Sequence, residues 1–151
     1  MNELGPTPNS ISGHTHRLMV RVYYEDTDAG GVVYYANYLK FAERARTEML
    51  REIGYEHKDN EKNHGINFVV RLCNIEFYKP GLLDDFLEVQ TEILAVRGAS
   101  IRMRQSIKKQ SQDLALLEIK LACICSNGNV MRIPLKLRNR ISGLIFVKGD
   151  G

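Results

Sequence analysis

The sequence predicts an α+β fold in which one long helix packs against one antiparallel sheet. Residues 36–53 carry apolar side chains at three- and four-residue intervals, which is the period of an amphipathic helix. Downstream, four runs rich in β-branched and aromatic residues follow one another, with short turns between them. In the run at 114–125, alternate residues are apolar, so one face of that strand is able to cover the helix.

The helix over 36–53 has recognisable ends and two contrasting faces. Asn37 is suited to cap its start, and Gly54 follows its last residue. The apolar face consists of Tyr38, Phe41, Ala42, Ala45, Met49 and Ile53. The other face carries Lys40, Glu43, Arg44, Arg46, Glu48 and Arg51. We expect most of these residues to be solvated, with Glu48 pairing with Arg44 one turn away.

Strands are predicted on both sides of this helix. Residues 17–24 alternate as a first strand, and the later runs occupy 66–78, 85–96, 99–109 and 114–125. Short connections favour antiparallel pairing of consecutive runs. Pro134 is expected to begin a short final helix with apolar positions at Leu135, Leu137, Ile141 and Leu144. Residues 1–16 are rich in Gly, Pro, Ser and Thr and are expected to form a flexible arm, and 17–151 a single domain.

Composition narrows the functional classes. A net charge of +3 is too small to argue for nucleic acid, and the basic runs lack the interleaved aromatic residues of such sites. No stretch approaches the roughly 18 apolar residues of a membrane span, and no signal peptide is visible. We therefore expect a cytoplasmic protein without an integral membrane segment.

The cysteines and histidines give no metal-ligand spacing. The number of cysteines is odd, and no CxxC pair occurs among Cys73, Cys123 and Cys125. We expect all three to be reduced thiols that pack as small core residues. The histidines lie in polar segments and are expected at the surface; they are His14, His16, His57 and His64.

The segment RVYYEDTDAGGVVYYANYLKF is the most informative part of the chain. Glu25, Asp26 and Asp28 follow a predicted strand, two glycines come next, and the long helix begins directly after them. Glycines permit close approach of a ligand, and free amides at a helix start are able to hold a developing oxyanion. A carboxylate beside such a turn is placed to attack a carbonyl or to activate water. Acids before a helix are also common for purely structural reasons, because they favour the positive end of its dipole.

This segment, from Arg21 to Tyr38, resembles the signature of the 4-hydroxybenzoyl-CoA thioesterase family. Residues 20–50 are most similar to the Tol-Pal-associated acyl-CoA thioesterases within that family. The resemblance extends over roughly residues 17–134. Its motif positions here are Thr27-Asp28, Gly31-Val32-Val33, Ala36 and Tyr38.

The resemblance implies a hotdog fold, with a long central helix wrapped by an antiparallel β-sheet, and a homodimer or homotetramer. It implies hydrolysis of acyl-CoA thioesters without a metal or other cofactor. Asp28 would be the catalytic carboxylate and Asp26 structural, while the backbone amide of Tyr35 would polarise the thioester carbonyl. Gly31, Val32 and Tyr38 would contact the substrate.

One position departs from the closest resemblance. Many Tol-Pal-associated members have histidine where this chain has Tyr35, whereas the aryl-CoA branch has tyrosine. The role of the amide does not depend on the side chain. The preferred acyl group, whether short, long or aryl, therefore stays open, as does the choice between Asp28 as nucleophile and as general base.

Two basic runs are candidates for binding the phosphates of CoA or the acidic surface of acyl carrier protein. Residues 97–112 contain no acid, and Arg97, Arg102 and Arg104 are the expected substrate contacts there. Arg132, Lys136, Arg138 and Arg140 form the second run. The plainer interpretation of both runs is a solvated surface.

Two other functions compete with thioester hydrolysis. A non-catalytic module that binds acyl carrier protein would share the fold, but the intact Asp28 motif argues against it. The second is a hotdog dehydratase, whose chemistry resembles that of a histidine paired with an acid on the helix. The helix predicted here contains no histidine.

Overall fold

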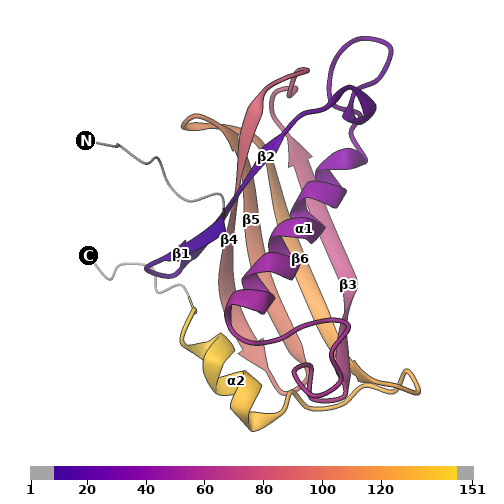
Figure 1. Cartoon of the computed structure of the whole chain (residues 1–151), viewed down its shortest axis with the longest axis vertical. Coiled ribbons are helices and arrows are strands. Elements are labelled where there is room, and N and C mark those ends of the chain that lie inside the picture. Colours follow the sequence, from indigo (N-terminus) through magenta and orange to yellow (C-terminus); the bar gives the residue numbers. More distant parts are fainter. Residues whose placement is uncertain (1–8, 146–151) are drawn as a thin grey trace.

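The computed structural model describes residues 9–145, which form one sheet with a long helix packed against one of its faces (Figure 1). The elements are β1 (Asn9–Ser12), β2 (Thr15–Arg21), the 3-10 turn η1 (Tyr24–Asp26), α1 (Asn37–Glu52), β3 (Ile66–Phe77), β4 (Phe86–Arg97), β5 (Ser100–Lys109), β6 (Gln112–Cys125) and α2 (Leu135–Ser142). The predicted α+β class, with one long helix against an antiparallel sheet, is confirmed.

The strands lie in the order β1-β2-β4-β5-β6-β3, and every neighbouring pair is antiparallel. The predicted pairing of consecutive runs holds for β4 with β5 and for β5 with β6 but is wrong for β3 with β4. The chain between β3 and β4 passes over the start of α1. There the Gly81 carbonyl accepts the amide of Val33, in the segment before the helix, across 2.8 Å. This crossing places β3 at one edge of the sheet, whereas β4 lies between β2 and β5.

The start of the described chain is more ordered than the sequence suggested. Residues 9–12 form β1, and Thr15 and His16 already belong to β2, so the predicted flexible arm is wrong for 9–16. Residues 1–8 of that arm lie outside the described part of the chain. His16 shares the inward parity of Val20 and is buried, which corrects its predicted place at the surface.

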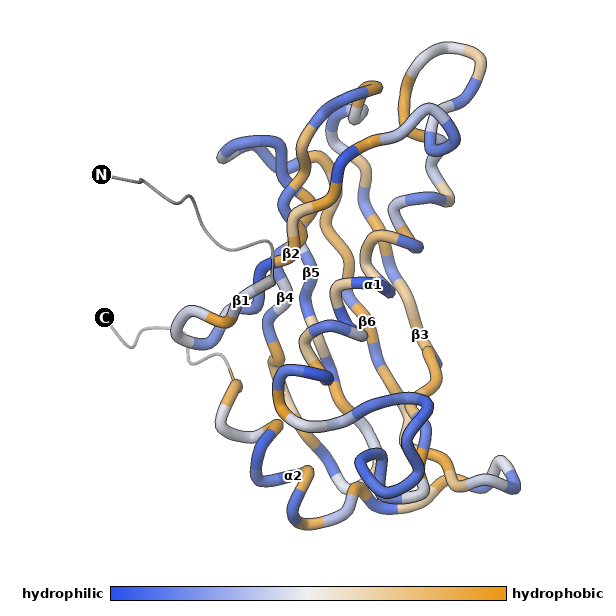
Figure 2. The backbone as a smooth tube through the Cα atoms, in the orientation of Figure 1, coloured by the Kyte–Doolittle hydropathy of each residue, from blue (hydrophilic) through white to orange (hydrophobic). Residues whose placement is uncertain are grey.

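The apolar face of α1 fills the centre of the molecule. Phe41, Ala42 and Ala45 are fully buried, and Tyr38 and Met49 are nearly so. Burial of a large apolar side chain stabilises the fold by about 1.5–3 kcal/mol, so this face anchors the helix on the sheet. In Figure 2 orange and blue alternate along the strands, whereas the segment that follows α1 is almost entirely blue.

The ends and polar face of α1 differ in detail from the prediction. Ala36, not Asn37, is the residue that precedes the first turn, and the Asn37 side chain donates instead to the Asp26 carbonyl across 2.8 Å. Gly54 adopts a φ of 96°, as expected for the residue after a helix. Glu48 forms an ion pair with Arg51, and its pairing with Arg44 stays a prediction.

Arg46 is buried, although it belongs to the face of α1 that is expected to be mostly solvated. Its guanidinium donates to the Gln105 side chain across 2.9 Å, and Gln105 lies on the face of β5 that meets α1. Hydrogen-bonding residues in the sheet therefore draw this one polar helix residue into the core.

The remaining predictions for the core are mostly met. Alternate residues of β6 from Leu117 to Cys123 are buried, and Leu137 and Ile141 of α2 pack into the same core. Leu135 is 71% exposed, Cys73 is exposed on β3, and Cys125 is only partly buried, so these three do not take the core positions predicted for them. Among the helices of residues 9–145, none is long and apolar enough to cross a bilayer.

Candidate functional site

The chain from Tyr23 to Ala36 forms a hairpin-like loop at one end of the sheet, above the first turn of α1 (Figure 1). The Tyr34 amide donates to the Asp26 carbonyl across 2.9 Å, and the Asp28 amide donates to the Val32 carbonyl across 2.9 Å. These two bonds fix the two sides of the loop against each other. The loop therefore presents its tip in a defined position.

Asp26 fastens the base of this loop. It is 8% exposed, and its carboxylate accepts the Tyr23 amide across 2.8 Å. Its carbonyl accepts both the Tyr34 amide and the Asn37 side chain, which ties the loop to the start of α1. The structural role expected for Asp26 is thus confirmed.

Asp28 lies at the exposed tip. One oxygen, Oδ1, accepts the Gly30 amide across 2.8 Å, and no hydrogen bond among residues 9–145 is recorded for Oδ2. Gly31 follows with a φ of 79°, a left-handed conformation that suits glycine, and its amide donates to the Asp28 carbonyl across 3.0 Å. The carboxylate is therefore held by one oxygen and offers the other to a reactant.

The amide of Tyr35 lies one residue before the N-cap of the 16-residue helix α1. Among the hydrogen bonds of the described residues, none is donated by this amide. A helix of this length carries partial positive charge at its N-terminus. An open amide at such a place is able to stabilise a developing negative oxygen.

A small cavity opens beside Tyr35. Its volume is about 250 Å³, and it is lined by Val33, Tyr35, Tyr38, Phe77, Tyr78, Lys79 and Pro80. The Phe77 ring stands edge-on to Tyr38 at 5.5 Å and to Tyr35 at 6.2 Å between ring centroids. The aromatic cavity, as we call these seven residues, thus has apolar walls next to the amide.

Tyr38 holds the far rim of the aromatic cavity in place. Its hydroxyl oxygen accepts the Gly81 amide across 2.8 Å, while the Gly81 carbonyl accepts the Val33 amide. A side chain at Gly81 would lie 3.1 Å from a Val33 methyl, so glycine permits the close approach. Burial raises the pKa of Tyr38 against the lowering effect of this hydrogen bond, so the hydroxyl stays protonated at neutral pH.

The structure thus brings together most of the residues that the sequence singled out. Asp28, Gly31, Val32 and Tyr35 share the loop, and Tyr38 follows in the first turn of α1. Sequence reasoning missed the far wall of the cavity, from Phe77 to Pro80. The run Phe-Tyr-Lys-Pro-Gly was interpreted only as the end of a strand, and nothing local showed that it crosses α1.

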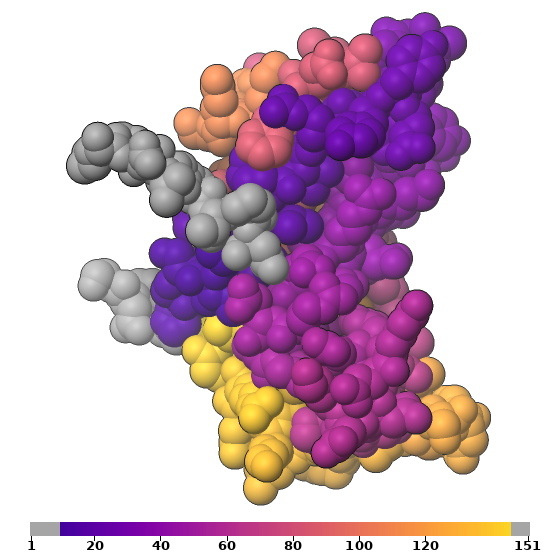
Figure 3. Space-filling view, in the orientation of Figure 1, coloured from indigo at the N-terminus to yellow at the C-terminus, as the bar shows by residue number. Residues whose placement is uncertain are grey.

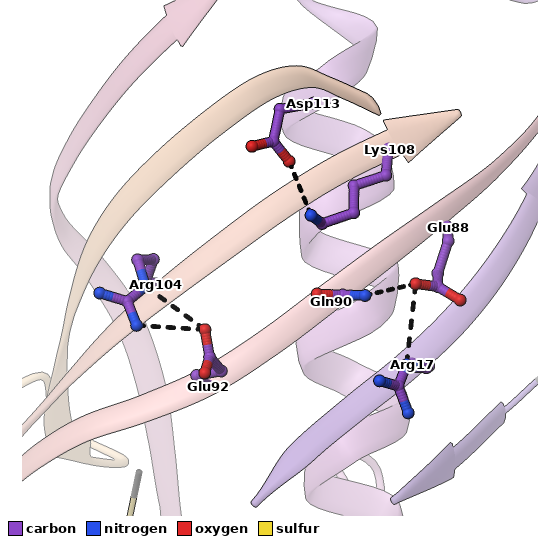
Figure 4. Close-up of polar contacts among 7 residues, drawn as sticks. All are labelled: Arg17, Glu88, Gln90, Glu92, Arg104, Lys108 and Asp113. Atoms are coloured by element: carbon purple, nitrogen blue, oxygen red, sulfur yellow. Dashed lines mark hydrogen bonds and ion pairs between the residues drawn. The ribbon is translucent and has the colours of Figure 1, made fainter. Parts of the chain in front are cut away.

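The predicted arginines lie elsewhere. Arg97 ends β4 next to α2, at the opposite end of the sheet from the Asp28 loop (Figure 1). Arg102 and Arg104 occupy the sheet face that points away from α1. Arg104 forms an ion pair with Glu92 at 3.3 Å, and this pair is one of several on the same face (Figure 4). A single chain does not bring them to Asp28, and their role in substrate binding stays a prediction.

Residues 9–145 contain no candidate metal site. No three metal-ligating side chains among His, Cys, Asp and Glu gather closely enough there to hold a metal ion. The carboxylate, the open amide and the aromatic cavity are what the described chain offers for reaction at a carbonyl.

A family model, the thioesterase-like superfamily, matches residues 22–141. The chain belongs to the thioesterase-like superfamily. The acyl-CoA thioester hydrolase YbgC of Escherichia coli is 46% identical over 124 residues, which are 82% of this chain and 87% of that protein. The alignment with this relative therefore covers most of both chains.

Solved structures agree with this membership. A probable thioesterase from Bartonella henselae is 36% identical, with a TM-score of 0.76 over 80% of this chain and 99% of that one. A 4-hydroxybenzoyl CoA thioesterase is 19% identical, with a TM-score of 0.78 over 85% of this chain and 99% of that one, and shows likeness of fold alone. The predicted thioesterase family and the hotdog fold are both confirmed, and the resemblance to the Tol-Pal-associated members stays a prediction.

Proposed function

We propose that this protein hydrolyses acyl-CoA thioesters to the free acid and CoA, with Asp28 as the catalytic carboxylate. The observation that carries the proposal is an exposed carboxylate on a fixed loop, followed by an open helix-start amide beside an apolar cavity. Relatives such as the Escherichia coli protein, named an acyl-CoA thioester hydrolase, support the choice of substrate.

Two reaction routes lead from the thioester to the free acid and CoA. In the first, the carboxylate attacks the thioester carbonyl, the carbon–sulfur bond breaks, and water then hydrolyses the resulting anhydride. In the second, Asp28 takes a proton from water as the water attacks the carbonyl, and the proton passes to the departing sulfur. Both routes use the same oxygen, Oδ2, and give the same products.

The tetrahedral intermediate of either route carries a negative oxygen. We assign that oxygen to the Tyr35 amide, with the dipole of α1 behind it. A donor of this kind is worth roughly 3 kcal/mol in the transition state. The acyl group then extends into the aromatic cavity, with Tyr38 on its wall. The contacts of Gly31 and Val32 with the substrate, which the family resemblance implies, are part of the same proposal.

The assay for this proposal is release of free thiol from a panel of thioesters: short aliphatic, long aliphatic and aryl, each on CoA and on acyl carrier protein. We expect turnover on at least one CoA thioester and its loss in Asp28→Asn. If a well-folded wild-type protein turned over none of them, the proposal would be rejected in favour of a non-catalytic acyl-carrier-binding module.

We also propose that the active form contains at least two copies, joined through β3. This strand ends the sheet in the described chain, and its outer edge pairs with no other strand there. Val69, Val70, Leu72 and Phe77 of β3 are each between 41% and 48% exposed. A long apolar edge of this kind favours pairing with another strand, and a second copy offers an identical one.

Antiparallel pairing of two β3 strands has a consequence for the site. It sets the Phe77 end of one copy beside the Ile66 end of the other. The Ile66 end borders a cavity of about 780 Å³, lined by residues of α1, of β3 and of the segment between them. Figure 3 views the molecule from the side on which α1 and the segment after it, both magenta, are exposed. Each aromatic cavity would then gain a wall from the second copy.

Size in solution tests this assembly. Val70→Lys places a charge on the exposed edge and is expected to give monomers with little activity. Val130→Lys is the matched control, since Val130 is 63% exposed and lies outside β3. A wild-type protein that is monomeric and fully active would contradict the assembly.

A cytoplasmic location is part of the same proposal. Cys73, Cys123 and Cys125 are all free thiols in the structure, which is typical of proteins in reducing compartments.

A further inference from the structure

Lys79 is the one charged residue among the seven that line the aromatic cavity. It is exposed at the rim, and the ion pairs of residues 9–145 do not include it. Some lysines of the described chain lie beside carboxylates: Lys109 is 2.8 Å from Asp85, and Lys108 is 3.0 Å from Asp113. Lys79 shares its lack of an ion pair with other exposed lysines of residues 9–145 but differs from them in lining the aromatic cavity. A cation is therefore held beside aromatic rings without an acidic partner.

The backbone around Lys79 is fixed. The amides of Tyr78 and Lys79 both donate to the Leu114 carbonyl, across 2.8 and 3.2 Å. Two residues later, the Gly81 amide is bonded to the Tyr38 hydroxyl. The stem of Lys79 thus starts from a backbone position tied both to β6 and to α1, at the cavity that the residue lines.

The neighbouring acid is already engaged. Glu76 accepts the Tyr78 hydroxyl across 3.1 Å. A binding site with apolar walls and a few placed polar groups uses those groups to orient its ligand. An ammonium at the mouth of such a cavity attracts a negative oxygen.

We infer that Lys79 is a specificity-determining residue, which binds an anionic oxygen of the substrate at the mouth of the aromatic cavity. The inference rests on the proposed thioester hydrolysis. A carboxylate on the acyl group and a phosphate of CoA both present this chemistry, because each is a compact anion that an ammonium pairs with. Thioesters without such an anion lose this contact.

The test uses matched substrates. One acyl chain of the panel, the fastest substrate where any is turned over, is compared with the same chain ending in a carboxylate. Each is prepared on CoA and on N-acetylcysteamine, which has no phosphate. Non-hydrolysable thioether analogues of all four are used for calorimetry, so that binding is measured even where turnover fails.

The variants separate charge from bulk. Lys79→Met keeps the stem and removes the charge, Lys79→Arg keeps the charge, and Lys40→Met is the control. Lys40 is exposed in the first turn of α1 and does not line the cavity.

If the acyl group carries the anion, wild type prefers the carboxylate-ended chain on both carriers by on the order of tenfold. Lys79→Met then abolishes the preference, and Lys79→Arg restores it. If CoA carries the anion, Lys79→Met weakens binding of both CoA compounds by a similar factor and leaves both N-acetylcysteamine compounds unchanged.

If Lys79→Met bound each of the four compounds as tightly as wild type does, the inference would be overturned. Turnover of no thioester by wild type, together with a binding difference at Lys79, would instead count against the proposed hydrolysis and leave the anion contact in place.

Discussion

The Gly81 amide donates a hydrogen bond of 2.8 Å to the Tyr38 hydroxyl, and these residues are 43 positions apart in the chain. This bond joins the first turn of α1 to the segment that crosses above it between β3 and β4. It is buried, and it closes the rim of the aromatic cavity.

Tyr38→Phe is expected to lower the free energy of unfolding by about 1–3 kcal/mol, because the buried Gly81 amide loses its acceptor. Urea denaturation at fixed protein concentration measures the change. Tyr35→Phe is the matched control, since Tyr35 is 62% exposed and its hydroxyl holds no part of the crossing segment. Equal stability of Tyr38→Phe and wild type would show that this bond does not hold the rim.

Gln105 organises the buried polar groups under α1. Its side chain accepts Arg46 and donates to the Ala42 carbonyl across 2.9 Å and to the Thr91 hydroxyl across 3.0 Å. Burial lowers the pKa of Arg46, since the charged form is poorly solvated there. The amide of Gln105 compensates part of that cost.

Gln105→Leu is therefore expected to destabilise the protein by about 3 kcal/mol, because it leaves a buried guanidinium without its acceptor. The double variant Arg46→Met, Gln105→Leu should recover part of the loss, since both polar partners are then absent. Arg44→Met, at an exposed position of the same helix, is the control. Strictly additive effects of the two single changes would contradict this coupling.

His16 makes stability depend on pH. Burial lowers its pKa to about 4, although the charge of Glu48 acts in the opposite direction. Between that value and the ordinary histidine pKa near 6.5, the unfolded chain binds a proton that the folded chain does not. The free energy of unfolding should then decrease as the pH falls from about 6.5 to 4, by up to about 3 kcal/mol.

The pH profile of chemical denaturation measures this effect. His16→Gln should flatten the profile across that window whatever it does to the absolute stability. His14→Gln serves as control, because His14 is exposed in the turn between β1 and β2. A slope that persists unchanged in His16→Gln would assign the pH dependence to other groups.

Periodic local patterns predicted the fold well. The apolar positions of α1 and the alternation in β6 each reflect burial against one partner, and both are visible in a window of a dozen residues. The edge position of β3 was not predictable in this way. It depends on the crossing of residues 78–85 over α1, and that crossing is fixed by contacts of Gly81 with Val33 and Tyr38, which are distant in sequence.

The residues of the candidate site also differ in whether local sequence predicted them. Asp28, Gly31 and Tyr35 lie in one short segment, so a resemblance in that segment was enough to find them. Lys79 and Phe77 reach the site only through the fold. Arg46 shows the reverse error: its helical position indicated solvent, and only the Gln105 side chain on β5 makes its burial possible.

The most direct test of the central proposal is the turnover number of Asp28→Asn beside that of Glu25→Gln, on the thioester that wild type hydrolyses best. Both acids are exposed in the same loop, so the pair separates a specific role from a general loss of negative charge. We predict that Asp28→Asn lowers kcat at least about a hundredfold with unchanged thermal stability, and that Glu25→Gln stays close to wild type. Turnover by Asp28→Asn at a rate near that of wild type would contradict the assignment of the chemistry to Asp28.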